Sequence, residues 1–304
     1  MRYINSILVS INTTTIYVCM YVLMYVCMYV CMYACMYVLK FATFINKNSS
    51  MPFTFKRKVL DAALLSSMLY GCETWLCLNL QPITAYYMQS IKLLLGVRRT
   101  TTNNLCLVEG GFPDLQSLVL KRRILFINKF IRGSSGDEPL ADVIKLCQRN
   151  NTRVYRVLQG AVNYYGDPVL HHRQNLFDLC TRQRESSSKV DMYMSMNHEM
   201  SVHHVYAAPT YIPDHLRVSF SRFRLSAHRL RVETGRWMRI PRNERLCVCN
   251  IDIQNEAHVM FHCPITLPIR QTYHIDNIDD WKSLYQRPLI EICDIIHRIM
   301  LEFP

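Results

Sequence analysis

A four-residue repeat dominates the start of this chain and limits what its first 50 residues can fold into. Residues 17–38 read YVCMYVLMYVCMYVCMYACMYV, and Tyr and Met each recur at every fourth position. The tetranucleotide ATGT, repeated and read in threes, encodes Met-Tyr-Val-Cys. We therefore interpret residues 1–50 as a translated low-complexity repeat, with an apolar helix as its expected form.

The same segment allows a second interpretation, that of a membrane anchor. Ile16 to Leu39 is a stretch of 24 uncharged, mostly apolar residues, which is long enough to cross a bilayer. The two interpretations are compatible, because an accidental apolar helix also partitions into lipid. We expect a membrane location if the repeat inserts, and a nuclear or cytoplasmic location if it is inert.

Composition narrows the fold of the remaining residues. Apolar residues make up 50% of the chain, enough for a sizeable core, whereas only 9 of the 304 residues are glycine. So few glycines argue against an all-β protein and against glycine-rich phosphate loops. The 13 cysteines have no regular spacing, which suits a reducing compartment better than a disulfide framework.

Hydrophobic periodicity predicts a mainly α fold. Residues 51–184 form the expected helical region, with helices over 59–76, 83–95, 113–131 and 167–184 and shorter candidates over 140–147 and 153–163. Residues 185–212 are polar and lack periodicity, which indicates a linker. Residues 213–304 form a basic region that ends in an apolar helix over 288–303, with at most a short hairpin around the cysteines.

Three cysteines and one histidine in the basic region have the spacing of a metal site. They follow the pattern C-x-C-x8-H-x4-C at Cys247, Cys249, His258 and Cys263. Two close pairs of ligands joined by a short loop can supply the four thiolate or imidazole ligands that a structural Zn²⁺ requires. His262 competes with His258 for the third position, and the alternative is two buried cysteines beside a surface histidine.

Arginine is concentrated just before this motif. Residues 217–245 contain nine arginines and only two acids, within a chain of formal net charge +12. Arginine pairs with phosphate and aromatic rings stack on unpaired bases, so we expect binding to single-stranded or structured RNA or DNA and no small-molecule substrate. The alternative is a solvated basic face with Phe220, Phe223 and Trp237 in the core. The candidate nucleic-acid-binding residues are Arg222, Arg224, Arg229, Arg231, Arg236, Trp237, Arg239, Arg242 and Arg245.

Two segments resemble a known family. LYGCETW at 69–75 is similar to the segment that follows the polymerase palm in LINE-type (non-LTR) retrotransposon reverse transcriptases. Residues 224–264, RLSAHRLRVETGRWMRIPRNERLCVCN…EAHVMFHCP, resemble the family's segment H-x-L-x-x-E-x-G-R-[W/Y], I-P-x-x-x-R-x-C and H-x-x-x-x-C-P. The resemblance implies a thumb-like helical region followed by a Cys-Cys-His-Cys zinc knuckle.

The chain departs from this family where catalysis would reside. A reverse transcriptase needs carboxylates that hold two metal ions, one pair of them in a Tyr/Phe-x-Asp-Asp hairpin. The adjacent aspartates of this chain are Asp279 and Asp280, which follow the cysteine motif. We therefore expect a catalytically incomplete fragment rather than an enzyme. A single-pass membrane protein with a basic cytosolic interaction domain and a free-standing zinc-binding regulator are the alternatives.

Overall fold

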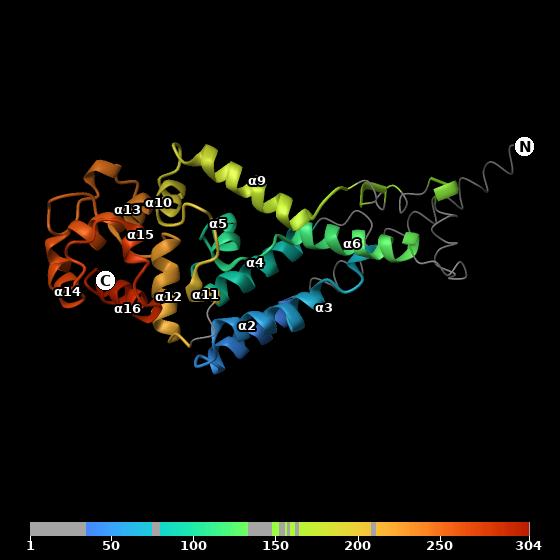
Figure 1. The fold of residues 1–304 in the computed structure, drawn as a ribbon, viewed down its shortest axis with the longest axis horizontal. Helices are drawn as coiled ribbons and strands as arrows, with labels where there is room; N and C mark the ends of the chain where they lie inside the picture. Colours follow the sequence, from blue (N-terminus) through green and yellow to red (C-terminus); the bar gives the residue numbers. More distant parts are fainter. Residues whose placement is uncertain are drawn as a thin grey trace, which may run out of the picture.

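The computed structural model of this chain describes residues 35–74, 80–132, 148–151, 156, 159–161, 164–207 and 211–303. Within these residues the fold is mainly helical, as expected, and instead of strands it has one isolated antiparallel bridge, between Leu246 and Ile253. Figure 1 shows an elongated arrangement in which α6 extends toward one end and α13 to α16 gather at the other. The expected helices at 140–147 and 153–163 fall wholly or largely outside the described residues.

The first described helix lies at the end of the segment that we interpret as a translated repeat. Residues 35–47 are helical, and Val38, Phe41 and Ile45 are buried in the main core. The end of this segment therefore packs against the body of the protein. Residues 1–34, with most of the repeat, lie outside the described residues, and no helix within the described part is long and apolar enough to cross a membrane.

A long helical segment follows and ends earlier than the sequence pattern predicts. It comprises α2 (Phe53–Val59), the π-helical turn η1 (Leu60–Leu65) and α3 (Ser66–Met68), with the 3-10 turn η2 (Cys72–Thr74) after it. Gly71, in the turn that follows the helix, adopts a φ of 64°, a left-handed conformation that glycine accepts without a steric cost. Arg122 then donates a 2.9 Å hydrogen bond to the carbonyl oxygen of Leu69.

Four longer helices complete the first part of the body: α4 (Gln81–Leu95), α5 (Asn103–Gly110), α6 (Leu115–Arg132) and α9 (Pro168–Gln183). Three of them match the expected helices over 83–95, 113–131 and 167–184, whereas α5 is new. The helix α9 begins where Asp167 accepts a 2.9 Å hydrogen bond from the backbone N–H of Val169. The helix α4 ends at Gly96, whose φ of 73° is left-handed.

Residues 185–212 are not the linker that their polarity predicts. They contain α10 (Ser188–Met196) and α11 (His204–Ala207), and the side chains of Tyr193, Met194 and Tyr206 are buried. The buried hydroxyl of Tyr193 donates a hydrogen bond to the carboxylate of Glu109 at 2.8 Å and accepts one from the amide of Asn197 at 3.0 Å. Tertiary packing therefore orders a segment that lacks a clear amphipathic pattern.

The last part of the chain is built from short elements between two longer helices. One hydrophobic core, with buried members from Val38 to Phe303, joins this part to the helices before it. The helices α12 and α16 pack against each other, with Phe220, Ile292 and Ile296 fully buried. The elements are α12 (Asp214–Arg224), α13 (Arg231–Trp237), η3 (Arg242–Glu244), η4 (His258–His262), η5 (Pro264–Thr266), α14 (Leu267–Thr272), α15 (Trp281–Leu284) and α16 (Leu289–Leu301).

Candidate metal centre and basic surface

The four residues of the Cys/His motif converge at one place in the fold. One ligand atom of each of Cys247, Cys249, His258 and Cys263 lies within 4.8 Å of those of the other three. The sulfurs of Cys247 and Cys263 are 3.7 Å apart, and the sulfur of Cys249 is 3.2 Å from Nε2 of His258. Three thiols and an imidazole at these separations form a cluster that could hold a metal ion.

A tight turn brings the first two cysteines to the cluster. The backbone N–H of Cys247 donates to the carbonyl of Asp252 at 2.8 Å, beside the bridge between Leu246 and Ile253. Between them Asn250 takes a φ of 59° and donates its N–H to the carbonyl of Cys247 at 2.8 Å. Asparagine tolerates this left-handed conformation better than most residues. The expected hairpin is therefore reduced to one bridge and a knuckle-like turn.

A π-helical turn brings the other two ligands together. In a π-helix the N–H of one residue bonds the carbonyl five residues earlier, and Cys263 bonds His258 in this way at 2.8 Å. This geometry aligns residues separated by five positions, the separation of His258 and Cys263. The side chain of Asn255 accepts the N–H of His258 at 2.8 Å at the start of the turn. At its end Arg270 donates to the carbonyls of Phe261 and Cys263.

The pKa values of the Cys263 and Cys249 thiols are shifted in opposite directions by burial and hydrogen bonding. Burial raises the pKa of Cys263 to about 12. Burial also acts to raise the pKa of Cys249, but backbone N–H groups of Ile251 and Asp252, together with the other two thiols, outweigh it and lower that pKa. Burial lowers the pKa of His258, which favours the neutral imidazole that a metal binds.

The structure separates His258 from its competitor. His258 is buried and points its Nε2 at Cys249, whereas His262 is exposed and lies outside the cluster. The alternative of a surface histidine beside two buried cysteines does not describe this arrangement. The amide of Gln254 additionally contacts the sulfur of Cys247 at 3.8 Å.

Arg245, just before the cluster, packs against and hydrogen-bonds to several residues that precede it in the chain. Arg245 donates to the carbonyl of Ile240 at 2.9 and 2.7 Å and to that of Val232 at 2.8 Å. A Cβ at Gly235 would lie 2.8 Å from the side chain of Arg245, so glycine is needed there. Arg245 was expected on the nucleic-acid surface, but its guanidinium group ties α13 to the segment that leads into the cluster.

Arg224 was also expected on the nucleic-acid surface, but it is buried in the core. It is 1% exposed and its guanidinium pairs with Glu109 at 2.6 and 3.0 Å. Tyr193 donates to the same carboxylate at 2.8 Å. Phe220 and Phe223 are fully buried, so they cannot stack on bases. No local pattern predicts this network, because Glu109 lies 115 residues away from Arg224.

Six of the predicted arginines remain on the surface, together with the predicted tryptophan. Trp237 is 56% exposed, and the guanidinium of Arg98 lies 4.6 Å from the centre of its ring. Arg98 belongs to the turn after α4, outside the arginine-rich segment 217–245. Three of the six are partly engaged: Arg222 donates to the carbonyl of Gly96 at 2.8 Å, Arg231 to that of Leu246 at 3.1 Å and Arg236 to the hydroxyl of Ser188 at 3.0 Å. The exposed arginines are Arg222, Arg229, Arg231, Arg236, Arg239 and Arg242.

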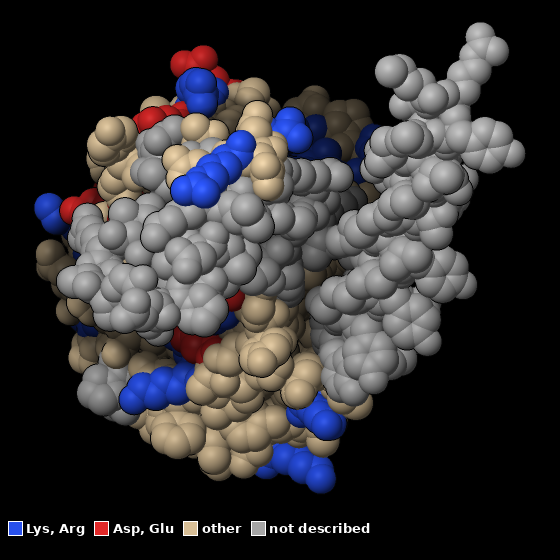
Figure 2. Space-filling model, turned by 90° about the vertical axis from the view of Figure 1, so that its right-hand side faces the viewer, with Lys and Arg blue, Asp and Glu red and all other residues tan. Residues whose placement is uncertain are grey.

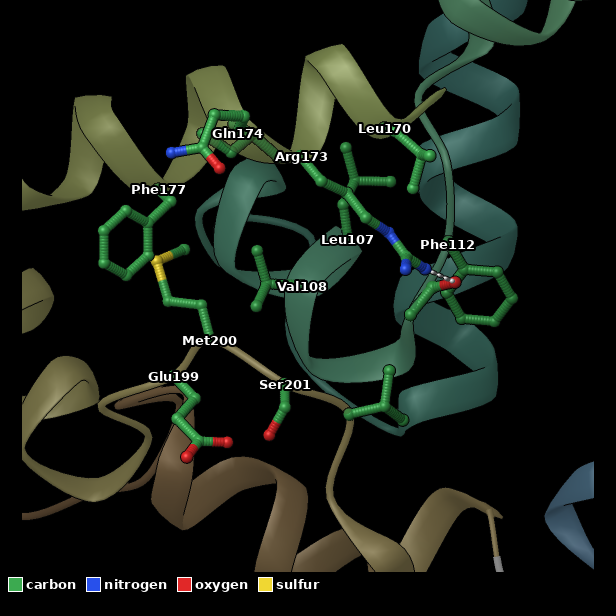
Figure 3. Close-up of a pocket in the computed structure, with 13 residues that line it drawn as sticks. Leu107, Val108, Phe112, Leu170, Arg173, Gln174, Phe177, Glu199, Met200 and Ser201 are labelled. Carbon is green, nitrogen blue, oxygen red and sulfur yellow. Dashed lines mark hydrogen bonds between the residues drawn. The ribbon is translucent and has the colours of Figure 1, made fainter. Parts of the chain in front are cut away.

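The opposite end of the molecule and a cavity in its body both differ from this arginine-rich surface. Figure 2 looks onto the end of the molecule opposite α13 to α16, where the visible Lys and Arg side chains lie apart from one another and some lie beside Asp or Glu. A cavity of about 500 Å³ lies between α5, α9 and residues 199–202, and Figure 3 shows the side chains that line it. Its arginine, Arg173, donates to the carbonyl of Gly111 at 3.3 Å, and the carboxylate of Glu199 also lines it. Apolar side chains such as Phe177 and Met200 form much of the rest.

Comparison of the chain with models of protein families, with curated proteins and with solved structures finds no match in any of the three.

Proposed function

We propose that residues 213–303 form a zinc-stabilised module that binds single-stranded or structured nucleic acid and carries out no catalysis. The observation that carries this proposal is the convergence of Cys247, Cys249, His258 and Cys263 within a segment rich in exposed arginines. The proposal joins a structural metal to a cationic surface.

Zinc is the metal that this ligand set favours. Zinc–sulfur bonds are about 2.3 Å long, so two sulfurs on a tetrahedral zinc lie about 3.8 Å apart. The sulfurs of Cys247 and Cys263 are 3.7 Å apart, close to that edge. Soft thiolates combined with an imidazole select zinc over magnesium or calcium. Because four protein ligands fill a tetrahedron, the metal would be structural and would have no open position for a substrate.

The exposed arginines support a nucleic-acid partner. Arg231 at the start of α13, and Arg239 and Arg242 between α13 and the Cys/His cluster, are exposed, as is the ring of Trp237 at the end of α13. Guanidinium groups pair with phosphates, and an exposed indole can stack on an unpaired base. We expect affinity with little dependence on base sequence, because backbone contacts carry no sequence information.

We also propose that the chain derives from the C-terminal part of a LINE-type reverse transcriptase. The support is the resemblance of residues 69–75 and 224–264 to that family. Several matching residues have structural roles here that would favour their retention: Leu230 is fully buried, and Gly235 leaves room for Arg245. The absence of a Tyr/Phe-x-Asp-Asp hairpin from the sequence is the reason for proposing a non-catalytic role.

Salt dependence of binding tests this proposal. Fluorescence anisotropy of a labelled single-stranded RNA with the full chain should give log affinity that falls with log salt with a slope of about −4, since six phosphate contacts contribute about 0.7 each. Replacing Arg231, Arg239 and Arg242 together with Ala should flatten the slope by about 2. Trp237→Ala should weaken binding without changing the slope.

The matched control removes three cations elsewhere on the surface, with Lys58→Ala, Arg149→Ala and Arg182→Ala, and should bind as the unmodified chain does. Binding that is independent of salt, or that survives the triple substitution unchanged, would contradict the proposed role of this surface. Equal affinity for a duplex of the same length would contradict the part assigned to Trp237.

A further inference from the structure

A second cavity lies where four separate parts of the chain meet. It has a volume of about 420 Å³ and is bounded by the turn after α4, by α12, by the segment between α12 and α13, and by α16. Arg98, Arg222, Arg229 and His297 line it, and Met300 and Phe303 supply apolar surface. Three arginines from two distant regions of the sequence thus share one concave site.

Close packing holds these regions in position. A Cβ added at Gly96 would lie 2.5 Å from the side chain of Val218, so the end of α4 is in direct contact with α12. Arg222 strengthens this contact by donating to the carbonyl of Gly96 at 2.8 Å. Ser219 and His297 form a 2.8 Å hydrogen bond between α12 and α16. The cavity is therefore a built feature of the fold rather than a gap between mobile side chains.

The cations around the cavity are not balanced by acids. Among the described residues that line it, none is Asp or Glu. Burial, followed by the positive charges of Arg98 and Arg229, lowers the pKa of Arg222, as expected for cations that repel one another. Holding three guanidinium groups together without a counter-charge disfavours folding, and a bound anion would relieve that repulsion.

The cavity in Figure 3 lacks these properties. Among the described residues that line it, Arg173 is the one arginine, and the carboxylate of Glu199 would repel an anion. Of these two cavities, the one beside α12 is therefore lined by several arginines and by no described Asp or Glu. The neighbouring indole of Trp237, stacked on Arg98, places an aromatic surface next to the same group of cations.

We propose that the cavity lined by Arg98, Arg222 and Arg229 binds a phosphate group. Guanidinium groups bind phosphate oxygens through paired, charge-assisted hydrogen bonds, and three of them around one concavity can surround a tetrahedral anion. The phosphate belongs either to the backbone of a nucleic acid, in which case this inference rests on the proposed function, or to a free phosphate. Arg98 would then be a binding residue that lies outside the arginine-rich segment.

The experiment uses the full chain and two probes, inorganic phosphate and a labelled single-stranded RNA. The test variant combines Arg98→Gln and Arg229→Gln, which change half-buried and exposed side chains outside the core. The matched control combines Lys58→Gln and Arg182→Gln, which removes the same charge from distant exposed positions. Thermal melts of both variants establish that each remains folded.

We expect the test variant to lose at least about tenfold in affinity for a probe that occupies the cavity, and the control to change it by less than about threefold. A loss confined to the RNA assigns the site to backbone phosphate, and a loss for inorganic phosphate assigns it to a free anion. If the test variant binds both probes as the unmodified chain does, the proposal is wrong.

The two proposals fail in different ways. If the unmodified chain binds RNA and the test variant binds it equally, the phosphate site is wrong while the proposed function stands. If the unmodified chain binds inorganic phosphate but no RNA, and the test variant loses that binding, the phosphate site stands and the proposed function is wrong. If the unmodified chain binds neither probe, both are wrong.

Discussion

The helical body and the metal cluster of this protein are held together by different forces. In the body, buried pairs such as Glu109 with Arg224 and Lys56 with Asp214 join helices far apart in the chain, inside a continuous apolar core. Residues 245–266, the knuckle, have only short turns and one bridge, around three cysteines and a histidine. If the cluster holds zinc as proposed, we expect the body to fold on its own contacts and the knuckle to depend on the metal.

The largest expected effect concerns this need for metal. Cys263→Ser should abolish metal-dependent stabilisation of the knuckle, because structural zinc contributes an apparent free energy on the order of 10 kcal/mol. Cys293→Ser alters a thiol that is equally buried but lies in α16, outside the cluster, and should retain the effect. Thermal melts with and without a zinc chelator distinguish them. A chelator response that is the same in both variants would remove the distinction between body and knuckle.

A smaller effect is expected when the buried ion pair between Arg224 and Glu109 is broken. Arg224→Ala leaves Glu109 buried without its partner and should cost about 3–5 kcal/mol of unfolding free energy. Arg229→Ala, which removes an exposed guanidinium five residues later, should cost less than about 1 kcal/mol. Urea denaturation measures both. Equal losses would mean that the buried pair does not stabilise the body.

The smallest effect concerns the start of α9 at the surface of the body. The hydrogen bond from Lys121, followed by the N–H of Val169, lowers the pKa of Asp167 below its ordinary 3.8. Asp167→Ala removes a helix cap and should cost about 1 kcal/mol, whereas Asp167→Asn retains the cap and loses only the charge.

The charge of Asp167 has a defined pH window. Because the folded-state pKa is the lower one, its stabilisation is complete above 3.8 and is lost as pH falls through the folded value. The melting difference between Asp167→Asn and the unmodified chain should therefore shrink below pH 3.8. A difference that is constant from pH 7 to pH 3 would show that the charge contributes nothing.

Sequence reasoning succeeded where a local pattern carries the information. Periodicity and Gly96 located α4, and spacing located the four members of the Cys/His cluster. It failed for Arg224 and for residues 185–212, because their structure depends on contacts with Glu109 and the core that are distant in the chain.

Metal content tests the central claim most directly. The full chain, purified in reducing buffer and desalted gently, should contain about one zinc per chain, because the cluster supplies one complete tetrahedral set of ligands. Cys263→Ser should contain almost none, and Cys293→Ser should match the unmodified chain. A zinc content near zero in the unmodified chain after refolding with zinc, or one that Cys263→Ser leaves unchanged, would contradict the account.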